Sequence, residues 1–312
     1  MTVPADPYRA TGAIRGWRVS TTTQPGALPL RPLTVGELLD AAVLLLRVRG
    51  PLLIGWGVAA AALEQLLLFP YRRLADVNSF YYPADDRWAK WALLLVVGFA
   101  AEAAIIAALS WPAAAVAPRA LLGRAAPGRE SPGRPAAVTA AVAVAVGVAC
   151  GAAVATALLW PTNALLLVLL LLTVALWLPT YGLLGHAVPA AVTERRGPVR
   201  ALSRSLVLSS RWFLRGAWVR VLAYLGWLLV RIAWGLGMLQ LISLVYASPD
   251  TTMDNVLMAG VYLVVNAFMY PVLACLDAVS YLEVRMRTEG LDIALRRHLA
   301  RGDDPTPTLV GA

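Results

Sequence analysis

Five ionisable residues and one amide lie inside long apolar stretches of this sequence, where they could bind an ion, carry a proton or pair with one another. They are Glu64, Glu102, Arg220, Arg231, Asp277 and Asn266. A charged side chain in hydrocarbon costs a few kcal/mol unless it has a partner or faces water. The sequence therefore leaves two interpretations open. In the first, the charges form buried ion pairs that fix helix register. In the second, Glu64, Glu102, Arg231 and Asn266 line a polar path for a substrate or protons.

Depth along the predicted helices indicates which charges could meet. At about 1.5 Å of rise per residue, Glu102 lies roughly 16 Å below the outer end of its apolar stretch, and Arg231 lies roughly 22 Å above the inner end of its own. Both are therefore near the middle of the membrane. Arg220 and Asp277 both fall toward the inner end of their stretches. We predict two ion pairs, Glu102 with Arg231 and Arg220 with Asp277.

Familiar catalytic motifs are missing. The sequence contains no Walker lysine loop, no HExxH and no GxSxG, which are the usual phosphate cradle, zinc site and nucleophile elbow. His186 and His298 are far apart, and we expect His186 to be a satisfied polar group inside the protein. Cys150 and Cys275 both fall in apolar stretches, which argues against a disulfide framework or a zinc site. We expect no catalytic residue, no metal and no cofactor.

The composition requires a bilayer. The chain has 312 residues, of which 59% are hydrophobic and 14% charged, and its mean hydropathy is +0.68. A water-facing surface cannot carry that much apolar side chain. The net charge of +9 is almost all arginine, with Lys90 the only lysine. Because the arginines flank apolar runs, anionic lipid headgroups explain them better than nucleic acid does.

Six apolar segments are each long enough to cross a hydrocarbon core of about 30 Å. They run from Leu52 to Phe69, Trp91 to Ala117, Ala136 to Trp160, Ala164 to Val192, Gly216 to Ala247 and Val256 to Leu282. Helices are expected because an open sheet would leave backbone groups unpaired in lipid. The sequence thus predicts an all-α polytopic membrane protein with six transmembrane helices.

The arginines also predict the orientation. With the N-terminus inside, the cytoplasmic regions carry 21 basic residues, the opposite side carries 4, and Arg220 and Arg231 lie within a span. Such an imbalance indicates that both termini are cytoplasmic, at the inner face of the cell membrane. The transmembrane domain is expected to cover residues 29–301, with disordered tails at 1–28 and 302–312.

Three amphipathic segments are expected to lie on the inner membrane surface. The first begins at Thr34, which forms a capping box with Glu37, while Leu33 and Leu38 are spaced as a hydrophobic staple. The second starts at Pro198, with Val199, Leu202, Leu206 and Phe213 on its apolar face. The third follows Gly290, with Leu291, Leu295 and Leu299 on its apolar face. Such segments anchor a bundle to the lipid surface, or they form a docking surface for a soluble partner.

Small residues recur every fourth position in the third predicted span. They are Ala143, Gly147, Gly151 and Ala155. Such a stripe lets a neighbouring helix backbone approach closely. We expect helix packing within the chain here, and the face of a homodimer is the alternative.

Three short segments carry a resemblance to a known family. The run from Arg31 to Asp40 (RPLTVGELLD) resembles the opening of actinobacterial proteins grouped with the membrane domain of glycerophosphoryl diester phosphodiesterases. The run from Gly197 to Leu206 (GPVRALSRSL) and the closing run from Tyr281 to Leu295, which includes RTEGLD at 287–292, look similar too. In the namesake enzymes the chemistry belongs to a separate soluble barrel, for which this chain has no room. The resemblance therefore implies an integral membrane protein and transfers no catalytic residue.

These observations favour a non-catalytic membrane protein that acts as a scaffold or assembly subunit, with anionic lipid and a cytoplasmic or membrane protein as partners. A transporter or channel for a small polar or anionic solute is the first alternative. An accessory that processes lipid or glycerophosphodiesters comes third, because it would need convergent acid, base or metal ligands.

Overall fold

The computed structural model describes residues 28–48, 50–77, 88–122, 133–158, 175, 179–245 and 251–310. Throughout these ranges all regular secondary structure is helical, which confirms the predicted all-α class. The helices are α1 (Val35–Val48), α2 (Gly50–Ala75), α3 (Trp88–Leu122), α4 (Gly133–Leu158), α6 (Ala187–Thr193), α7 (Pro198–Val245), α8 (Thr251–Glu289), α9 (Leu291–Arg301) and α10 (Thr306–Val310).

Four helices are long and apolar enough to cross a membrane: Gly50–Ala75, Lys90–Leu122, Arg215–Val245 and Thr252–Glu289. They correspond to the first, second, fifth and sixth predicted spans. A shorter apolar stretch, Pro135–Ala149, overlaps the third. Most of the fourth predicted span lies outside the described residues. Its described end is interrupted, because residues 179–184 are helical, Gly185 and His186 form a turn, and α6 follows.

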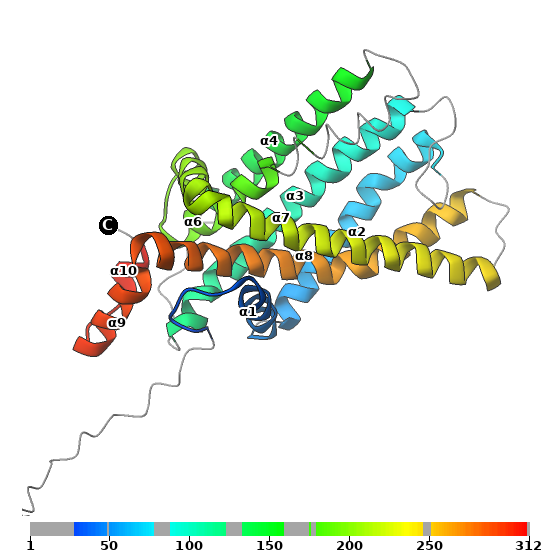
Figure 1. Cartoon of the computed structure of the whole chain (residues 1–312). Coiled ribbons are helices and arrows are strands. Elements are labelled where there is room, and N and C mark those ends of the chain that lie inside the picture. Colours follow the sequence, from blue (N-terminus) through cyan, green and yellow to red (C-terminus); the bar gives the residue numbers. More distant parts are fainter. Residues whose placement is uncertain are drawn as a thin grey trace, which may run out of the picture.

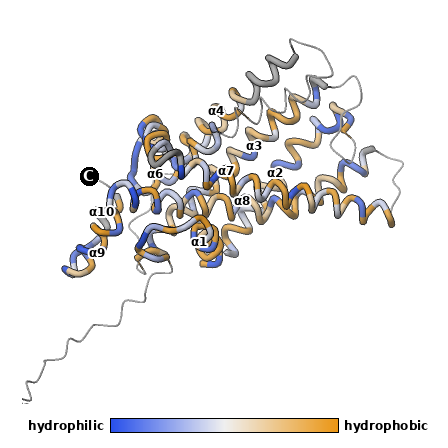
Figure 2. Tube along the Cα trace, viewed as in Figure 1, coloured by the Kyte–Doolittle hydropathy of each residue, from blue (hydrophilic) through white to orange (hydrophobic). Residues whose placement is uncertain are grey.

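The long helices run side by side, with α2, α3 and α4 adjacent and α7 lying antiparallel to α8 (Figure 1). The starts of α2, α4 and α7 lie at the same end of the bundle as the ends of α3 and α8, and α1, α6, α9 and α10 gather there. Apolar residues line the middle of the long helices, and polar residues gather around α6, α9 and α10 (Figure 2).

Two helices are much longer than a bilayer requires. At about 1.5 Å per residue, α7 with its 48 residues is about 72 Å long, and α8 with its 39 residues is about 58 Å long. We predicted that the second amphipathic segment is a separate surface helix. It forms instead the first turns of α7. On the predicted apolar face Val199 is 80% exposed and Leu206 is exposed, while Leu202 is partly buried against the core.

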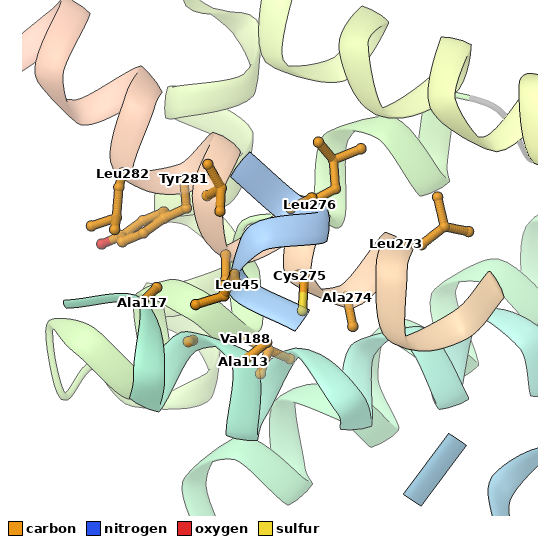
Figure 3. Close-up of a cluster of buried hydrophobic side chains, with 14 of the residues drawn as sticks. Leu45, Ala113, Ala117, Val188, Leu273, Ala274, Cys275, Leu276, Tyr281 and Leu282 are labelled. Atoms are coloured by element: carbon orange, nitrogen blue, oxygen red, sulfur yellow. The ribbon is translucent and has the colours of Figure 1, made fainter. Parts of the chain in front are cut away.

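The central element is α8. Of its most apolar stretch 56% is buried inside the protein, whereas only 6% of the corresponding stretch of α7 is buried. It packs against α2, α3, α7 and α1. Near the polar end of the bundle, apolar side chains from α1, α3, α6 and α8 meet in one buried cluster (Figure 3). The cluster includes Leu45, Ala113, Ala117, Val188, Cys275, Leu276 and Leu282. The first amphipathic helix, α1, is thus packed on the bundle through Leu38, Ala41, Ala42 and Leu45.

Close helix contacts depend on small residues. A Cβ at Gly147 of α4 would lie 3.5 Å from Ala100 Cβ of α3, so this part of the predicted small-residue stripe faces a helix of the same chain. The contacts of Gly151 and Ala155 lie outside the described residues, and Ala143 is half-buried. A tighter approach between two helices involves Gly57 of α2, where a Cβ would lie 2.5 Å from the carbonyl oxygen of Ala267 in α8.

The C-terminal tail is more ordered than its composition suggests. We predicted disorder from Gly302 onward, but Thr306–Val310 forms α10. Leu309 is buried, and the Arg285 side chain donates a hydrogen bond of 2.7 Å to its carbonyl oxygen. The predicted N-terminal tail, apart from Leu28, lies outside the described residues.

Replacing Gly57 with alanine tests the α2 to α8 contact. The added methyl group would collide with the α8 backbone, so Gly57→Ala should lower the free energy of unfolding by about 1–3 kcal/mol. Thermal unfolding of the detergent-solubilised protein measures this. The matched control is Gly55→Ala, which has no atom within 4 Å of the new Cβ and should be neutral or slightly stabilising. Equal effects of the two variants would contradict the contact.

Candidate functional site

Polar residues of α7 and α8 share the interior of the bundle. On α7 they are Ser205, Ser209, Arg220, Tyr224 and Arg231, and on α8 they are Asn266, Tyr270, Asp277 and Ser280. Along each helix, successive members are separated by three, four, seven or eleven residues, and so lie on one face. Both helices therefore turn a polar face inward and leave their apolar side chains for lipid or for the other helices.

The predicted pair of Glu102 and Arg231 is present near the middle of the bundle. Arg231 Nη1 lies 2.8 Å from Glu102 Oε1, and the Tyr224 hydroxyl donates to Glu102 Oε2 at 2.8 Å. Glu102 and Tyr224 are buried, and the Arg231 side chain is 23% exposed. The carboxylate thus has a charged donor and a neutral donor, as a buried charge requires.

Glu64 is held differently. Its carboxylate accepts hydrogen bonds from the Tyr270 hydroxyl at 2.6 Å, Asn266 Nδ2 at 2.8 Å and Gln65 Nε2 at 3.2 Å. Gln65 in turn accepts a hydrogen bond from Arg72. Among the described residues no basic side chain lies within ion-pair distance of Glu64, so neutral donors from α2 and α8 satisfy it. Asn266 therefore belongs to the Glu64 cluster rather than to the Glu102 pair.

The second predicted pair is also present, toward the polar end of the bundle. Arg220 contacts Asp277 with two nitrogens, Nε to Oδ1 at 2.5 Å and Nη2 to Oδ2 at 2.8 Å. Ser110 of α3 donates to Oδ2 at 3.2 Å. Arg220 and Asp277 are both buried. This two-point geometry suits the planar guanidinium and joins α7 to α8.

Arg220 also completes the interrupted helix before α6. The turn at Gly185 and His186 leaves carbonyl groups of the preceding helix without an i+4 donor. Arg220 Nη1 donates to the Tyr181 carbonyl, and its guanidinium stacks 3.7 Å from the centre of the Tyr181 ring. Ser205 and Ser209 donate to the Leu183 carbonyl at 2.6 and 3.2 Å. A cation at a helix C-terminus also interacts favourably with the helix dipole.

His186 is satisfied within the same turn, as predicted. Its Nδ1 lies 3.0 Å from Ser209 Oγ, and its Nε2 lies 3.0 Å from Ser280 Oγ. A serine beside a histidine can form a nucleophile and base, but here all three side chains are buried. A Cβ at Gly216 would lie 2.9 Å from the imidazole ring, which leaves no room for a substrate on that side. The arrangement therefore supports the helix break.

A second network, which the sequence analysis missed, lies at the polar end of the bundle. Glu194 accepts from the Tyr281 hydroxyl at 2.5 Å, and its carboxylate lies 2.9 Å from Arg204 and 3.5 Å from Arg285. Glu289 pairs with Arg204 and, at 3.0 Å, with Arg285. The spacing of Arg285 with Glu289 and of Glu283 with Arg287 was the signal in the sequence, because residues four apart meet on a helix.

Arginines also hold the segment that precedes α1. The Leu33 carbonyl accepts from Arg215 at 3.1 Å and from Arg287 at 2.7 Å, while Arg296 donates to the Leu30 carbonyl. The predicted capping box is confirmed. The backbone N–H of Thr34 donates to Glu37 at 2.8 Å, and that of Glu37 donates to Thr34 Oγ1 at 3.4 Å. We call this collection of α1, α9, α10, the polar ends of α7 and α8 and the connection at Glu194 the platform.

Two carboxylates of the platform have altered acidity. Burial raises the pKa of Glu194, but the hydrogen bonds from Arg204 and Tyr281 and the charge of Arg285 outweigh burial and hold the pKa below its usual value. The hydrogen bond from Arg31 and those from Thr34 lower the pKa of the exposed Glu37 to about 2. Both side chains are therefore ionised at neutral pH.

The described residues contain no group of three His, Cys, Asp or Glu side chains that could hold a metal ion. The charges at Glu102, Arg231, Arg220 and Asp277 are paired, and those of Glu64 and Glu194 have several donors. No protein-family model, curated protein or solved structure matches this chain. The arrangement is that of a buried structural network joined to an ordered platform.

Neutralising one member of the Arg220 pair should destabilise the fold. Asp277→Leu or Arg220→Met leaves an unpaired buried charge, and we expect a loss of about 3–5 kcal/mol in the free energy of unfolding. The double variant should recover part of that loss, because no charge then remains. Ser110→Ala, which removes only a neutral donor, should cost about 0.5–1.5 kcal/mol. Thermal unfolding in detergent separates these outcomes, and a double variant no better than the worse single variant would refute the pairing.

Acid should weaken the platform through Glu194. Because folding lowers its pKa, its stabilising contribution is complete above the ordinary value of about 4.5 and is lost as the pH falls through the folded value. The midpoint of thermal unfolding should therefore drop more steeply with acid in the wild-type protein than in Glu194→Gln. Asp40→Asn, on the exposed side of α1, provides the control. Parallel curves for wild type and Glu194→Gln would contradict the assignment.

Proposed function

We propose that this chain is a non-catalytic integral membrane protein that serves as a scaffold or assembly subunit at the inner face of the cytoplasmic membrane. In this proposal six helices cross the bilayer, both termini are cytoplasmic, and the platform faces the cell interior. The proposal draws on the four long apolar helices, on the two further apolar segments of the sequence and on the distribution of arginine.

The observation that carries the proposal is the continuity between bundle and platform. The fifth predicted span begins at Gly216, so the 18 residues of α7 from Pro198 to Arg215 extend about 27 Å beyond it. Lipid headgroups add only about 5–8 Å to each side of the hydrocarbon core. The polar end of α7, together with α1, α9 and α10, therefore supports a folded surface in the aqueous phase.

Arginines divide between two roles in this proposal. Arg204, Arg215, Arg285 and Arg287 are used within the platform. Arg47, Arg119, Arg200, Arg297 and Arg301 are exposed and are available to anionic headgroups, at about 1 kcal/mol for each residue near the surface. The same exposed arginines are available to acidic groups of a protein partner.

Transport of a small polar or anionic solute is the second candidate, and two observations favour it. The helix break at Gly185 and His186 resembles in kind the interrupted helices that line transporter sites. Asn266 Oδ1 is buried without a hydrogen-bond partner among the described residues. Against these stands the pairing of Glu102 with Arg231, which leaves neither charge free for a solute.

Copurification tests the scaffold proposal against transport. The full chain, expressed in its own membrane and extracted in mild detergent, should bring down a protein partner in a fixed ratio, and Arg200→Glu or Arg297→Glu on the platform should reduce that ratio. Asp40→Lys, at an exposed position of α1, provides a charge-change control away from these positions. Purification without any partner, combined with solute or ion flux in liposomes, would overturn the proposal in favour of transport.

Labelling of single cysteines tests the orientation. In a background with Cys150→Ala and Cys275→Ala, a cysteine at Asp303, whose side chain is 51% exposed, should react with an impermeant maleimide only after the inner face is opened. A cysteine at Thr162, in the predicted hairpin between the third and fourth spans, should react in intact cells. The reverse pattern would contradict the proposed topology.

A further inference from the structure

The C-terminal segment is folded back onto the platform. It comprises Asp303 to Val310 and contains α10, which has only five residues. Isolated helices shorter than about 12–15 residues are marginal in water, so α10 owes its order to docking. The segment follows Gly302, which has a φ of +75°, a conformation that glycine adopts without strain. Its composition of aspartate, proline and threonine gave the prediction of disorder.

Several contacts hold this segment, including a hydrogen bond of 3.0 Å from the Asp303 backbone N–H to the His298 carbonyl oxygen. Pro305 and Leu309 are buried, whereas Asp303, Asp304 and Pro307 are exposed. Leu309 belongs to the same apolar cluster as Leu291 and Leu295 of α9, and α10 packs against α9. Arg285 donates to the carbonyl oxygens of Leu309 at 2.7 Å and Thr308 at 3.4 Å. These anchors must offset the conformational entropy lost when eight residues are ordered.

The surface beneath the segment does not depend on it. Arg285 is fixed independently by Glu289 at 3.0 Å and by Glu194 at 3.5 Å, and α9 also packs on α8. If the segment dissociates, the Arg285 guanidinium and the site that the Leu309 side chain occupies become accessible together. We call Arg285 and the α9 face that contacts α10 the tail-docking surface.

We propose that the C-terminal segment is a displaceable plug on a peptide-docking surface. The inference rests on the proposed scaffold function, because it names where on the platform a protein partner binds and what blocks it. The partner is a short helical segment that offers a leucine-like side chain in place of Leu309 and open C-terminal carbonyl groups to Arg285. Such a segment satisfies the same contacts that the chain now makes with itself.

A labelled peptide can replace the unidentified partner in the test. The peptide carries residues 302–312 with fluorescein at its N-terminus, and its binding to the full chain in detergent is followed by fluorescence anisotropy. In the full chain with Leu309→Asp, the charge cannot remain buried and the plug should leave its seat. That variant should bind the peptide at least about tenfold more tightly than wild type, where the tethered segment competes at a high effective concentration.

Three controls make the test decisive. Pro307→Asp adds the same charge at an exposed position of the plug and should leave peptide binding at the wild-type level. A peptide with Leu309→Ala should bind the Leu309→Asp chain at least about tenfold more weakly than the wild-type peptide does. Hydrogen exchange at residues 303–310 should rise in Leu309→Asp and remain low in Pro307→Asp. Slow exchange in Leu309→Asp, or a folded Leu309→Asp chain that does not bind the peptide, would overturn the proposal.

The same variants separate this inference from the scaffold function. If a partner copurifies equally with wild type and Leu309→Asp, the scaffold stands and the plug is refuted. If Leu309→Asp captures more partner than wild type does, both are supported. If the peptide binds as described but neither chain captures a partner, the docking surface stands without the proposed function. A second copy of the chain as the captured protein would mean that the segment is exchanged between copies, which contradicts a separate partner.

Discussion

The structure depends on one constraint, which is that a charge buried among apolar helices needs a partner that the same chain supplies. Glu102 with Arg231 and Arg220 with Asp277 meet this need across α3, α7 and α8. Because an unpaired charge in hydrocarbon is costly, each pair fixes the rotation and register of its helices. The inward polar faces of α7 and α8 follow, and so does the outward apolar surface of α7.

The same constraint explains the helix break and the platform. The carbonyl groups released at Gly185 and His186 need donors, and Arg220, Ser205 and Ser209 provide them from α7. At the polar end of the bundle Glu194, Glu283 and Glu289 are shared among arginines of α7 and α8. The bundle and the platform are thus one connected structure, which is what a rigid assembly surface at a membrane requires.

The sequence predicted features that follow from local chemistry. Helix class, four of the spans, the capping box at Thr34 and Glu37 and both buried pairs could be derived from hydropathy, spacing and depth. The sequence did not reveal that Pro198 begins a helix continuous with the fifth span. A helix of 48 residues is longer than a membrane crossing requires and longer than is usual for a helix in water. Nor did it reveal Glu194, whose role depends on Arg204, Tyr281 and Arg285, which are distant in sequence. Docking of Leu309 likewise depends on tertiary contacts that composition does not encode.

A double-mutant cycle on Glu102 and Arg231 tests the central claim most directly. Glu102→Gln, Arg231→Gln and the double variant would be compared by unfolding in detergent. If the two charges are structural partners, the double variant should lose less free energy of unfolding than the two single variants lose together, by about 0.5–3 kcal/mol. Strictly additive losses would contradict the account and would identify these charges as independent groups on a polar path.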